Sequence, residues 1–270
     1  MSEITTQTRD DLVAAALALA DAARPATLAH FRDGALVADN KEAGGFDPVT
    51  AADREAEEAM LAVLARLRPD DAVLGEEFGY RPGSSGLTWV LDPVDGTRAF
   101  LSGTPTWGVL IAVGDETGPR LGVIDQPFIG ERFVGGFGEA WSEGPMGRRA
   151  LATRAPRPLS EAILFTTFPE VGSAAERDAF HDLAGRVRLT RYGLDCYAYA
   201  LVAAGQIDLV VEAGLQAYDI QAPMAVIEAA GGVVTDWRGG PAQDGGRVLA
   251  AANPQIHAAA LEVLSRAPQD

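Results

Sequence analysis

The chain of 270 residues can bury a substantial core, and its 47% hydrophobic and 22% charged residues are ordinary for a folded protein. Its net charge of −16 argues against nucleic acid and membrane partners, because both bind basic surfaces, and most of this charge is expected on a solvated surface. The single cysteine, Cys196, excludes an intramolecular disulfide, and the chain shows neither a signal-peptide pattern nor an apolar run near transmembrane length, so we predict a cytoplasmic location.

The N-terminal part of the chain is predicted to form two helices joined by an irregular loop at residues 39–50. Apolar residues recur at helical spacing over residues 10–32, where alanine is also frequent, and again over residues 51–67. Pro69 lies just beyond the second helix, where a helix commonly ends. The predicted buried faces are Leu12, Ala16, Leu19 and Ala23 in the first helix and Ala56, Met60, Val63 and Leu67 in the second.

Asp53, near the start of the second helix, has a structural role that needs no chemistry. Thr50 is predicted to cap this helix, and Asp53 follows three residues later, where the acidic member of a capping box belongs. An acid in the first turn also interacts favourably with the helix dipole. From the residues alone, this structural role is the leading interpretation of Asp53.

Carboxylates follow two predicted strands that are close in sequence. A short strand at residues 72–74 leads to a pair of glutamates that begins at Glu76, and a run of β-formers at residues 87–91 leads to Asp92 and Asp95. Adjacent glutamates are usually solvated surface. If the two strands are neighbours, however, three or four carboxylates converge and require a cation, since like charges held close raise one another's pKa.

The motif LDPVDGT at residues 91–97 places different binding groups side by side. Pro93 favours an extended conformation at the residue before it, Gly96 permits a sharp turn, and Thr97 begins a short predicted helix at residues 98–101. Carboxylates bind hard divalent cations and free N–H groups bind anions, so the motif describes a site for a metal-bound phosphate. An ordinary Asp-Pro and Asp-Gly turn is an equally good interpretation of these seven residues alone.

The rest of the chain is predicted to contain a β-meander followed by alternating strands and helices. The polar, glycine-rich segment 142–149 predicts a domain boundary near residue 150. Asp219 precedes a later helix, where it is expected either to cap that helix or to complete a metal site between the two halves. The predicted strands are 106–113, 120–126, 131–136, 163–167, 187–190, 207–212, 233–235 and 248–251, and the predicted helices are 174–185, 197–204, 220–230 and 257–266.

Several of these segments occur together in one known family. In order and spacing they make the chain similar, over nearly its whole length, to the inositol monophosphatase-like family of metal-dependent phosphatases. The combination is far more specific than any one segment. The segments are 47–53 (DPVTAAD), 75–77 (GEE), 92–97 (DPVDGT), the pair Glu212 and Asp219, and the helix end 229–232 (AAGG).

The resemblance implies a fold of the α+β or α/β class, namely a layered α-β-α-β-α sandwich with two sub-domains. Residues 1–150 are implied to form an N-terminal α+β sub-domain with an antiparallel sheet and most of the metal ligands. Residues 151–270 are implied to form a C-terminal α/β sub-domain that supplies Asp219 and the substrate contacts. Dimers are frequent in the family, so a homodimer is expected.

Within this family the chain is most similar to the histidinol-phosphate phosphatases. This closer resemblance is carried by the stretches 102–108 (SGTPTWG), 121–127 (LGVIDQP), 192–219 and 233–237 (VVTDW). Tyr218 stands where the wider family has tryptophan, and this departure matches the histidinol-phosphate branch. The implied reaction is the Mg²⁺-dependent hydrolysis of L-histidinol phosphate to L-histidinol and phosphate, a step of histidine biosynthesis, without a phosphoenzyme.

The resemblance also implies the metal ligands. Glu76, Asp92 and the carbonyl of Val94 are implied to hold one Mg²⁺, and Asp92, Asp95 and Asp219 a second. A third, weaker ion is expected beside Glu76, and Mn²⁺ is a plausible substitute. The chemistry of these donor atoms agrees, because hard oxygen ligands select such cations over zinc.

The remaining implied roles concern phosphate and water. The N–H groups of Gly96 and Thr97 are implied to bind phosphate oxygens. Glu76 and the hydroxyl of Thr97, supported by Asp53, are implied to be the catalytic residues. They orient and deprotonate a metal-bound water, which then attacks phosphorus in line.

Asp195 and Glu212 are the implied contacts for the alcohol part of the substrate. Histidinol carries an ammonium and a basic imidazole, for which two acids are suitable charge partners. The alternative role of Asp195 is the N-cap of a helix that begins near Tyr197. Inositol 1-phosphate, or a broad range of phosphomonoesters, is the alternative substrate.

Other classes of function fit the sequence less well. An aspartyl-phosphate mechanism needs a second aspartate two residues after the nucleophile, whereas Asp92 and Asp95 are three apart. A cysteine phosphatase needs a phosphate loop with an arginine after the thiolate, and YAYALV follows Cys196 instead. A nucleotide-binding P-loop is absent. A scaffold protein that only binds metal is the non-enzymatic alternative, although its expected mark, the loss of ligands, is not seen.

Overall fold

The computed structural model describes residues 6–33, 39–40, 48–168 and 170–267, and for 39–40 and 48–49 it describes the backbone only. Asp47, which opens one of the motifs, and most of the predicted loop at 39–50 lie outside these residues. The loop was predicted to be irregular throughout. This is wrong at its described positions, where β1 (Asp39–Asn40) and β2 (Pro48–Val49) pair antiparallel.

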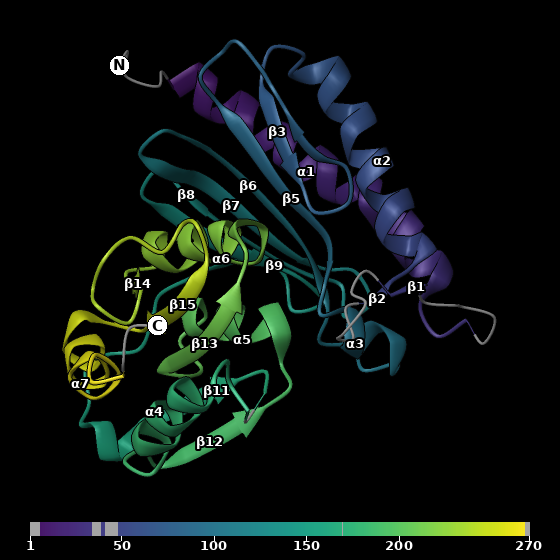
Figure 1. The fold of residues 1–270 in the computed structure, drawn as a ribbon. Helices are drawn as coiled ribbons and strands as arrows, with labels where there is room; N and C mark the ends of the chain where they lie inside the picture. Colours follow the sequence, from purple (N-terminus) through teal and green to yellow (C-terminus); the bar gives the residue numbers. More distant parts are fainter. Residues whose placement is uncertain (1–5, 34–38, 41–47, 169, 268–270) are drawn as a thin grey trace.

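Two sheets and the helices around them account for most of the described chain (Figure 1). The helices are α1 (Thr6–His30), α2 (Ala51–Leu67), α3 (Thr97–Leu101), α4 (Ala174–Ala184), α5 (Asp195–Ala203), α6 (Ala217–Ala229) and α7 (Pro254–Leu264), with a short 3₁₀ turn at Leu159–Glu161. The first sheet contains β3 (Ala72–Gly75), β4 (Gly79–Arg81), β5 (Thr88–Asp95), β6 (Gly108–Asp115), β7 (Gly118–Gln126), β8 (Glu131–Gly136), β9 (Glu139–Glu143) and β10 (Arg149–Ala150). The second contains β11 (Ile163–Thr166), β12 (Leu189–Tyr192), β13 (Leu209–Leu215), β14 (Val233–Thr235) and β15 (Gly246–Ala251).

These elements stack in five layers, as Figure 1 shows. Helices α1 and α2 cover one face of the first sheet, whose strand order is β10-β9-β8-β7-β6-β5-β3-β4. Helices α5 and α6 lie between this sheet and the second, whose order is β12-β11-β13-β15-β14, and α4 and α7 form the last layer. The predicted α-β-α-β-α sandwich is therefore confirmed.

The parallel pair β3 and β5 determines where the site forms. Every other pairing in the first sheet is antiparallel among the described strands, but Gly75 at the end of β3 pairs with Leu91 of β5 in parallel register. The two strand ends that carry carboxylates are therefore neighbours. Strand β5 also continues beyond the predicted end at Leu91 to Asp95, with a register shift where Pro93 offers no N–H to the ladder.

Helix α2 has the predicted limits but a different buried face. Ala56 and Met60 are buried as predicted, whereas Val63 is only half-buried and Leu67 is 44% exposed. Leu64 takes the buried position instead. On a helix with 3.6 residues per turn, the next buried residue after Met60 can lie three or four positions later. In α2 it lies four positions later, and the sequence alone does not distinguish the two spacings.

Helix α6 is mostly apolar, and its residues 222–227 are all buried, because it packs between the two sheets. The backbone of α6 lies directly on the first sheet at two glycines. A Cβ added at Gly122 would lie 2.2 Å from the carbonyl oxygen of Ala222, and one at Gly135 would lie 2.5 Å from the Cα of Val226. This close approach fixes the helix, and with it Asp219 in its first turn, against the sheet that carries the other carboxylates.

Helix α1 is long and apolar enough to cross a membrane by length and composition alone, with a mean hydropathy of 1.4 over an 18-residue window. Alanine contributes much of this apolar character, and Asp21 and Arg24 interrupt the apolar residues. In the fold, Leu12, Leu19 and the alanines between them are buried against α2 and the first sheet. The buried face is that of a core helix.

Candidate active site

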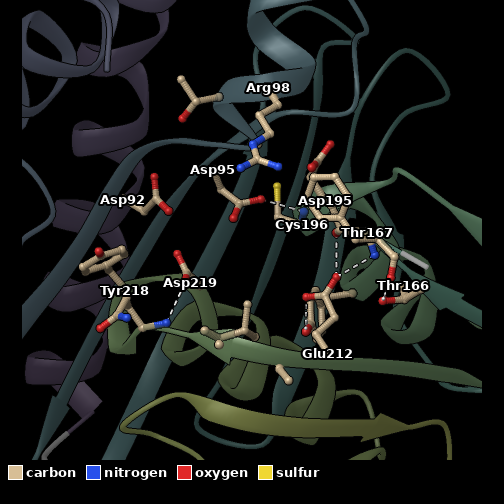
Figure 2. Close-up of a pocket in the computed structure, with 18 of the residues that line it drawn as sticks. Asp92, Asp95, Arg98, Thr166, Thr167, Asp195, Cys196, Glu212, Tyr218 and Asp219 are labelled. Carbon is tan, nitrogen blue, oxygen red and sulfur yellow. Dashed lines mark hydrogen bonds between the residues drawn. The ribbon is translucent and has the colours of Figure 1, made fainter. Parts of the chain in front are cut away.

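Three aspartates from distant parts of the chain converge in one cavity. Asp92 and Asp95 lie on the last part of β5, and Asp219 lies in the first turn of α6. One carboxylate oxygen from each lies within 4.8 Å of the others, and Figure 2 shows the three side chains directed toward a common space. The cavity has a volume of about 810 Å³, and Glu76, Val94 and the turn after Asp95 also line it.

The loop after β3 places Glu76 beside this cluster, and a buried glutamate holds that loop in place. Glu57 of α2 is completely buried and accepts hydrogen bonds from the N–H of Glu77 at 2.8 Å and of Phe78 at 3.1 Å. The sequence reasoning missed Glu57. Its signal was a charged residue on the otherwise apolar face of α2, four residues after Asp53.

The cluster is electrostatically unfavourable without a cation. Burial, followed by the charges of Glu76 and Asp95, raises the pKa of Asp92 well above its usual range. Burial and the charges of Glu76 and Glu212 raise the pKa of Asp219 to about 7. A divalent cation among these groups would offset both burial and mutual repulsion, which is the arrangement that protein metal sites use.

The donor atoms suit a hard cation such as Mg²⁺ or Mn²⁺. All charged groups in the cluster are carboxylates, and the carbonyl of Val94 accepts a hydrogen bond at 3.2 Å from the hydroxyl of Thr97. A carbonyl oxygen has a second lone pair, so Val94 retains the capacity to bind a cation. The N–H of Val94 donates to Asp92 at 3.0 Å, which fixes the turn that carries both groups.

We expect Mg²⁺ to stabilise the protein more at about pH 8 than at about pH 5. The pKa of Asp219 is raised to about 7 and that of Asp53 to about 6, from an ordinary value of 3.8. The metal-free folded state then binds more protons than the unfolded chain between these values, so its stability falls as the pH rises through this window. Thermal unfolding in EDTA and in Mg²⁺ should show a rise in Tm of about 5 °C at the higher pH and almost none at the lower. Equal rises at both pH values would contradict this linkage.

Asp53 has the predicted structural role and an additional feature. Its Oδ2 accepts hydrogen bonds from the N–H of Thr50 at 2.8 Å and from its hydroxyl at 2.6 Å, so the capping box is confirmed. Its Oδ1 is buried and has no hydrogen-bond partner among the described residues. Burial, with a smaller contribution from the charges of Glu76 and Glu77, raises its pKa to about 6. Such an oxygen is suited to a water molecule or a hydrated cation.

Neither Asp195 nor Asp219 is an N-cap, so both of those alternatives are wrong. Asp195 is the first residue of α5, after the N-cap Leu194, and it has a φ of +47°. Asp219 is the third residue of α6, where its Oδ2 accepts a hydrogen bond from the N–H of the N-cap Gln216 at 2.6 Å. Helix α5 begins two residues earlier than predicted and α6 begins three residues earlier, because both helices pack between the two sheets.

Glu212 lines the same cavity and is held by three donors. Its Oε1 accepts hydrogen bonds from the N–H of Thr167 at 2.9 Å and from the hydroxyl of Thr167 at 2.6 Å (Figure 2). Its Oε2 accepts a hydrogen bond from the hydroxyl of Tyr199 at 2.8 Å. Asp95 is held in a similar way by the N–H of Cys196 at 2.7 Å. The sequence reasoning did not single out Thr167, Tyr199 or Cys196 for these contacts, although Tyr199 and Cys196 lie within a stretch that carries the resemblance.

The structure thus places Glu76, Asp92, Val94, Asp95, Gly96, Thr97, Asp195, Glu212 and Asp219 around one cavity. Asp53 is the exception among the predicted site residues, since it does not line the cavity and lies buried in the first turn of α2. A set of carboxylates beside a turn with backbone N–H groups can bind cations and a phosphate together.

Comparison with known proteins agrees with this arrangement. The sequence pattern of the Inositol monophosphatase family matches residues 8–269. The chain is 39% identical to the bifunctional phosphatase IMPL2 of Arabidopsis thaliana, over 97% of this chain and 78% of that protein. It is 35% identical to the histidinol-phosphatase of Mycobacterium tuberculosis, over 95% and 97% of the two chains.

Other relatives have different names. The chain is 34% identical to the inositol-1-monophosphatase of Mesorhizobium japonicum, over 83% of this chain and 85% of that protein. Among solved structures, an inositol monophosphatase from Zymomonas mobilis superposes with a TM-score of 0.84 at 38% identity, covering 95% of this chain and 98% of that one. The chain therefore belongs to the inositol monophosphatase family of phosphatases.

Proposed function

We propose that this protein is a divalent-metal-dependent phosphomonoesterase whose substrate is L-histidinol phosphate, which it hydrolyses to L-histidinol and phosphate in histidine biosynthesis. The observation that carries the choice of substrate is the pair of carboxylates, Asp195 and Glu212, in the cavity that contains the metal cluster. An alcohol with an ammonium and an imidazole would find two charge partners there. An inositol ring would offer only hydroxyl groups, which can donate hydrogen bonds to these carboxylates but form no ion pair with them.

The proposed metal site contains two Mg²⁺ ions, with a weaker third ion beside Glu76 and Mn²⁺ as a substitute. Glu76, Asp92 and the carbonyl of Val94 hold the first ion, and Asp92, Asp95 and Asp219 hold the second. When bound, such ions polarise the phosphoryl group, lower the pKa of a water molecule and neutralise the leaving oxygen. The crowding of these carboxylates and their raised pKa values support the proposal.

The side chains around the ions have separate tasks in the proposed mechanism. The N–H groups of Gly96 and Thr97 bind phosphate oxygens. The Thr97 hydroxyl donates a hydrogen bond to the carbonyl of Val94, so the lone pairs of the hydroxyl oxygen can accept a hydrogen bond from the attacking water. Glu76 takes the proton of that water, with Asp53 as support through its unpartnered oxygen. The water oxygen bonds to phosphorus and the ester P–O bond breaks. The leaving alkoxide takes a proton from solvent water, and Glu76 returns the proton it accepted to solvent.

A panel of phosphomonoesters tests the substrate. We expect kcat/KM for L-histidinol phosphate to exceed that for inositol 1-phosphate and glycerol 2-phosphate by about tenfold or more, because one charge-assisted contact supplies at least that discrimination. The measurement is phosphate release at saturating Mg²⁺, with EDTA as the control. Faster turnover of inositol 1-phosphate would reverse the assignment in favour of an inositol-1-phosphatase, and equal turnover would indicate a broad phosphomonoesterase.

Glu212→Gln should raise KM for L-histidinol phosphate by about tenfold and change KM for glycerol 2-phosphate by less than about twofold. Glutamine keeps the size of the side chain and one acceptor oxygen but removes the negative charge. Steady-state kinetics on both esters measure the difference, and the exposed Glu262→Gln serves as the matched control. Equal effects on the two esters would remove the specificity role.

Other expectations from the sequence remain predictions. They are the division of the chain near residue 150, the homodimer and the cytoplasmic location. A metal-binding scaffold without activity is the non-enzymatic alternative, and the phosphomonoester panel decides between it and an enzyme, since a scaffold would release no phosphate from any ester.

A further inference from the structure

The carboxylate of Asp195 is held in an unusual backbone conformation. Asp195 has a φ of +47°, in the left-handed region that residues other than glycine seldom adopt, and Gly193, two residues before it, has a φ of +77°. Such conformations persist where the surroundings determine them. The residue is half-buried, and its side chain lines the cavity.

The hydroxyl of Thr106 is the contact that fixes this side chain. It donates to Oδ2 of Asp195 at 2.8 Å and lies 3.5 Å from the carbonyl of Gly193. Thr106 is anchored in turn, because its own carbonyl accepts a hydrogen bond from the side chain of Gln126 at 3.1 Å. Gln126 is the last residue of β7 and is buried, so the first sheet determines the position of Thr106.

On its other side, Asp195 packs against the turn that is proposed to bind phosphate. A Cβ added at Gly96 would lie 2.7 Å from Cγ of Asp195. Within the part of the chain that the structure describes, Oδ1 of Asp195 has no hydrogen-bond donor, whereas Oδ2 is taken by Thr106. One oxygen is thus fixed by the protein, and the other is available to a ligand next to the phosphate turn.

We propose that Thr106 is a positioning residue for substrate specificity: by holding Oδ2, it directs Oδ1 of Asp195 toward a cationic group on the alcohol, close to the phosphoryl group. This inference rests on the proposed function for the identity of the alcohol. Thr106 lies in the loop before β6 and touches neither the metal cluster nor the reacting atoms. It therefore affects KM for cationic esters and leaves the rate of the chemical step unchanged.

The test compares Thr106→Val, which removes the hydroxyl at nearly constant size, with Thr106→Ser, which keeps it. We expect Thr106→Val to raise KM for L-histidinol phosphate and the inhibition constant of L-histidinol by about tenfold. For kcat, and for KM of glycerol 2-phosphate, we expect changes below about twofold, and Thr106→Ser should restore wild-type values. The matched control is Thr104→Val, at an exposed threonine of the same loop.

Equal rises in KM for the cationic and the neutral ester, or no rise for either, would overturn the proposal. If valine lowers Tm, Thr106→Ala removes the same hydroxyl and gives the same comparison. Failure of the proposed function has a different signature, since the wild-type protein would then show no preference for L-histidinol phosphate over neutral esters. If the wild type prefers L-histidinol phosphate and Thr106→Val retains that preference unchanged, only the role of Thr106 is contradicted.

Discussion

Asp92→Asn is expected to reduce phosphomonoesterase activity by about a thousandfold or more while the fold remains intact. Asp92 lies at the centre of the cluster and is the proposed ligand of both ions, so the substitution removes a charge from each. Asparagine can still accept the hydrogen bond from the N–H of Val94, which preserves the turn. Because burial and neighbouring acids raise the pKa of Asp92, a neutral side chain is not expected to destabilise the metal-free protein.

Two measurements on this variant separate metal binding from folding. Phosphate release at increasing Mg²⁺ should remain near background, and the rise in Tm that Mg²⁺ gives the wild type should be lost. The Tm in EDTA should equal or exceed that of the wild type. Asp182→Asn, at an exposed aspartate paired with Arg186, is the control and should retain full activity. Substantial turnover by Asp92→Asn at saturating Mg²⁺ would argue against a ligand shared by two ions.

Gly96→Ala is expected to lower kcat/KM by about a hundredfold, because it disturbs the proposed phosphate turn and Asp195 together. Gly96 has a φ of +84°, and its added Cβ would collide with the carboxyl group of Asp195. Gly86 provides a matched control, since it also has a φ of +84° but no atom lies within 4 Å of its added Cβ.

The comparison of the two glycine variants isolates the collision from backbone strain. Gly86→Ala should lose about 1 kcal/mol of unfolding free energy, the typical destabilisation of alanine in a left-handed conformation, and Gly96→Ala should lose more because of the collision. Only Gly96→Ala should lose activity, measured as phosphate release from L-histidinol phosphate and glycerol 2-phosphate. If Gly86→Ala impairs activity equally, or if Gly96→Ala remains fully active, the contact between the turn and Asp195 is unimportant.

The sequence predicted those features that depend on local patterns. Helix α2 has the predicted limits because a capping box begins it and Pro69 follows it. The neighbouring ends of β3 and β5 were proposed as a condition for a metal site, and the parallel pairing meets that condition. The sequence located the two strand ends but left their pairing as a condition, because strand pairing depends on contacts between segments.

The features that failed depend on contacts between distant segments. Asp195 and Asp219 were assigned as alternative N-caps, yet both helices start earlier, since packing of α5 and α6 between the sheets determines their first turns. Glu57 and Thr106 carried no motif of their own, because their importance comes from hydrogen bonds to residues about 20 and 89 positions away. One sequence does not reveal such pairs.

The absence of side chains at Gly122 and Gly135, where α6 rests on the first sheet, has a consequence for engineering. Any larger residue there would push α6 outward and carry Asp219 away from Asp92 and Asp95. Attempts to broaden the range of accepted alcohols should therefore leave Gly122 and Gly135 unchanged. They have more freedom at the rim of the cavity around Phe168, which is 44% exposed and far less constrained by backbone packing.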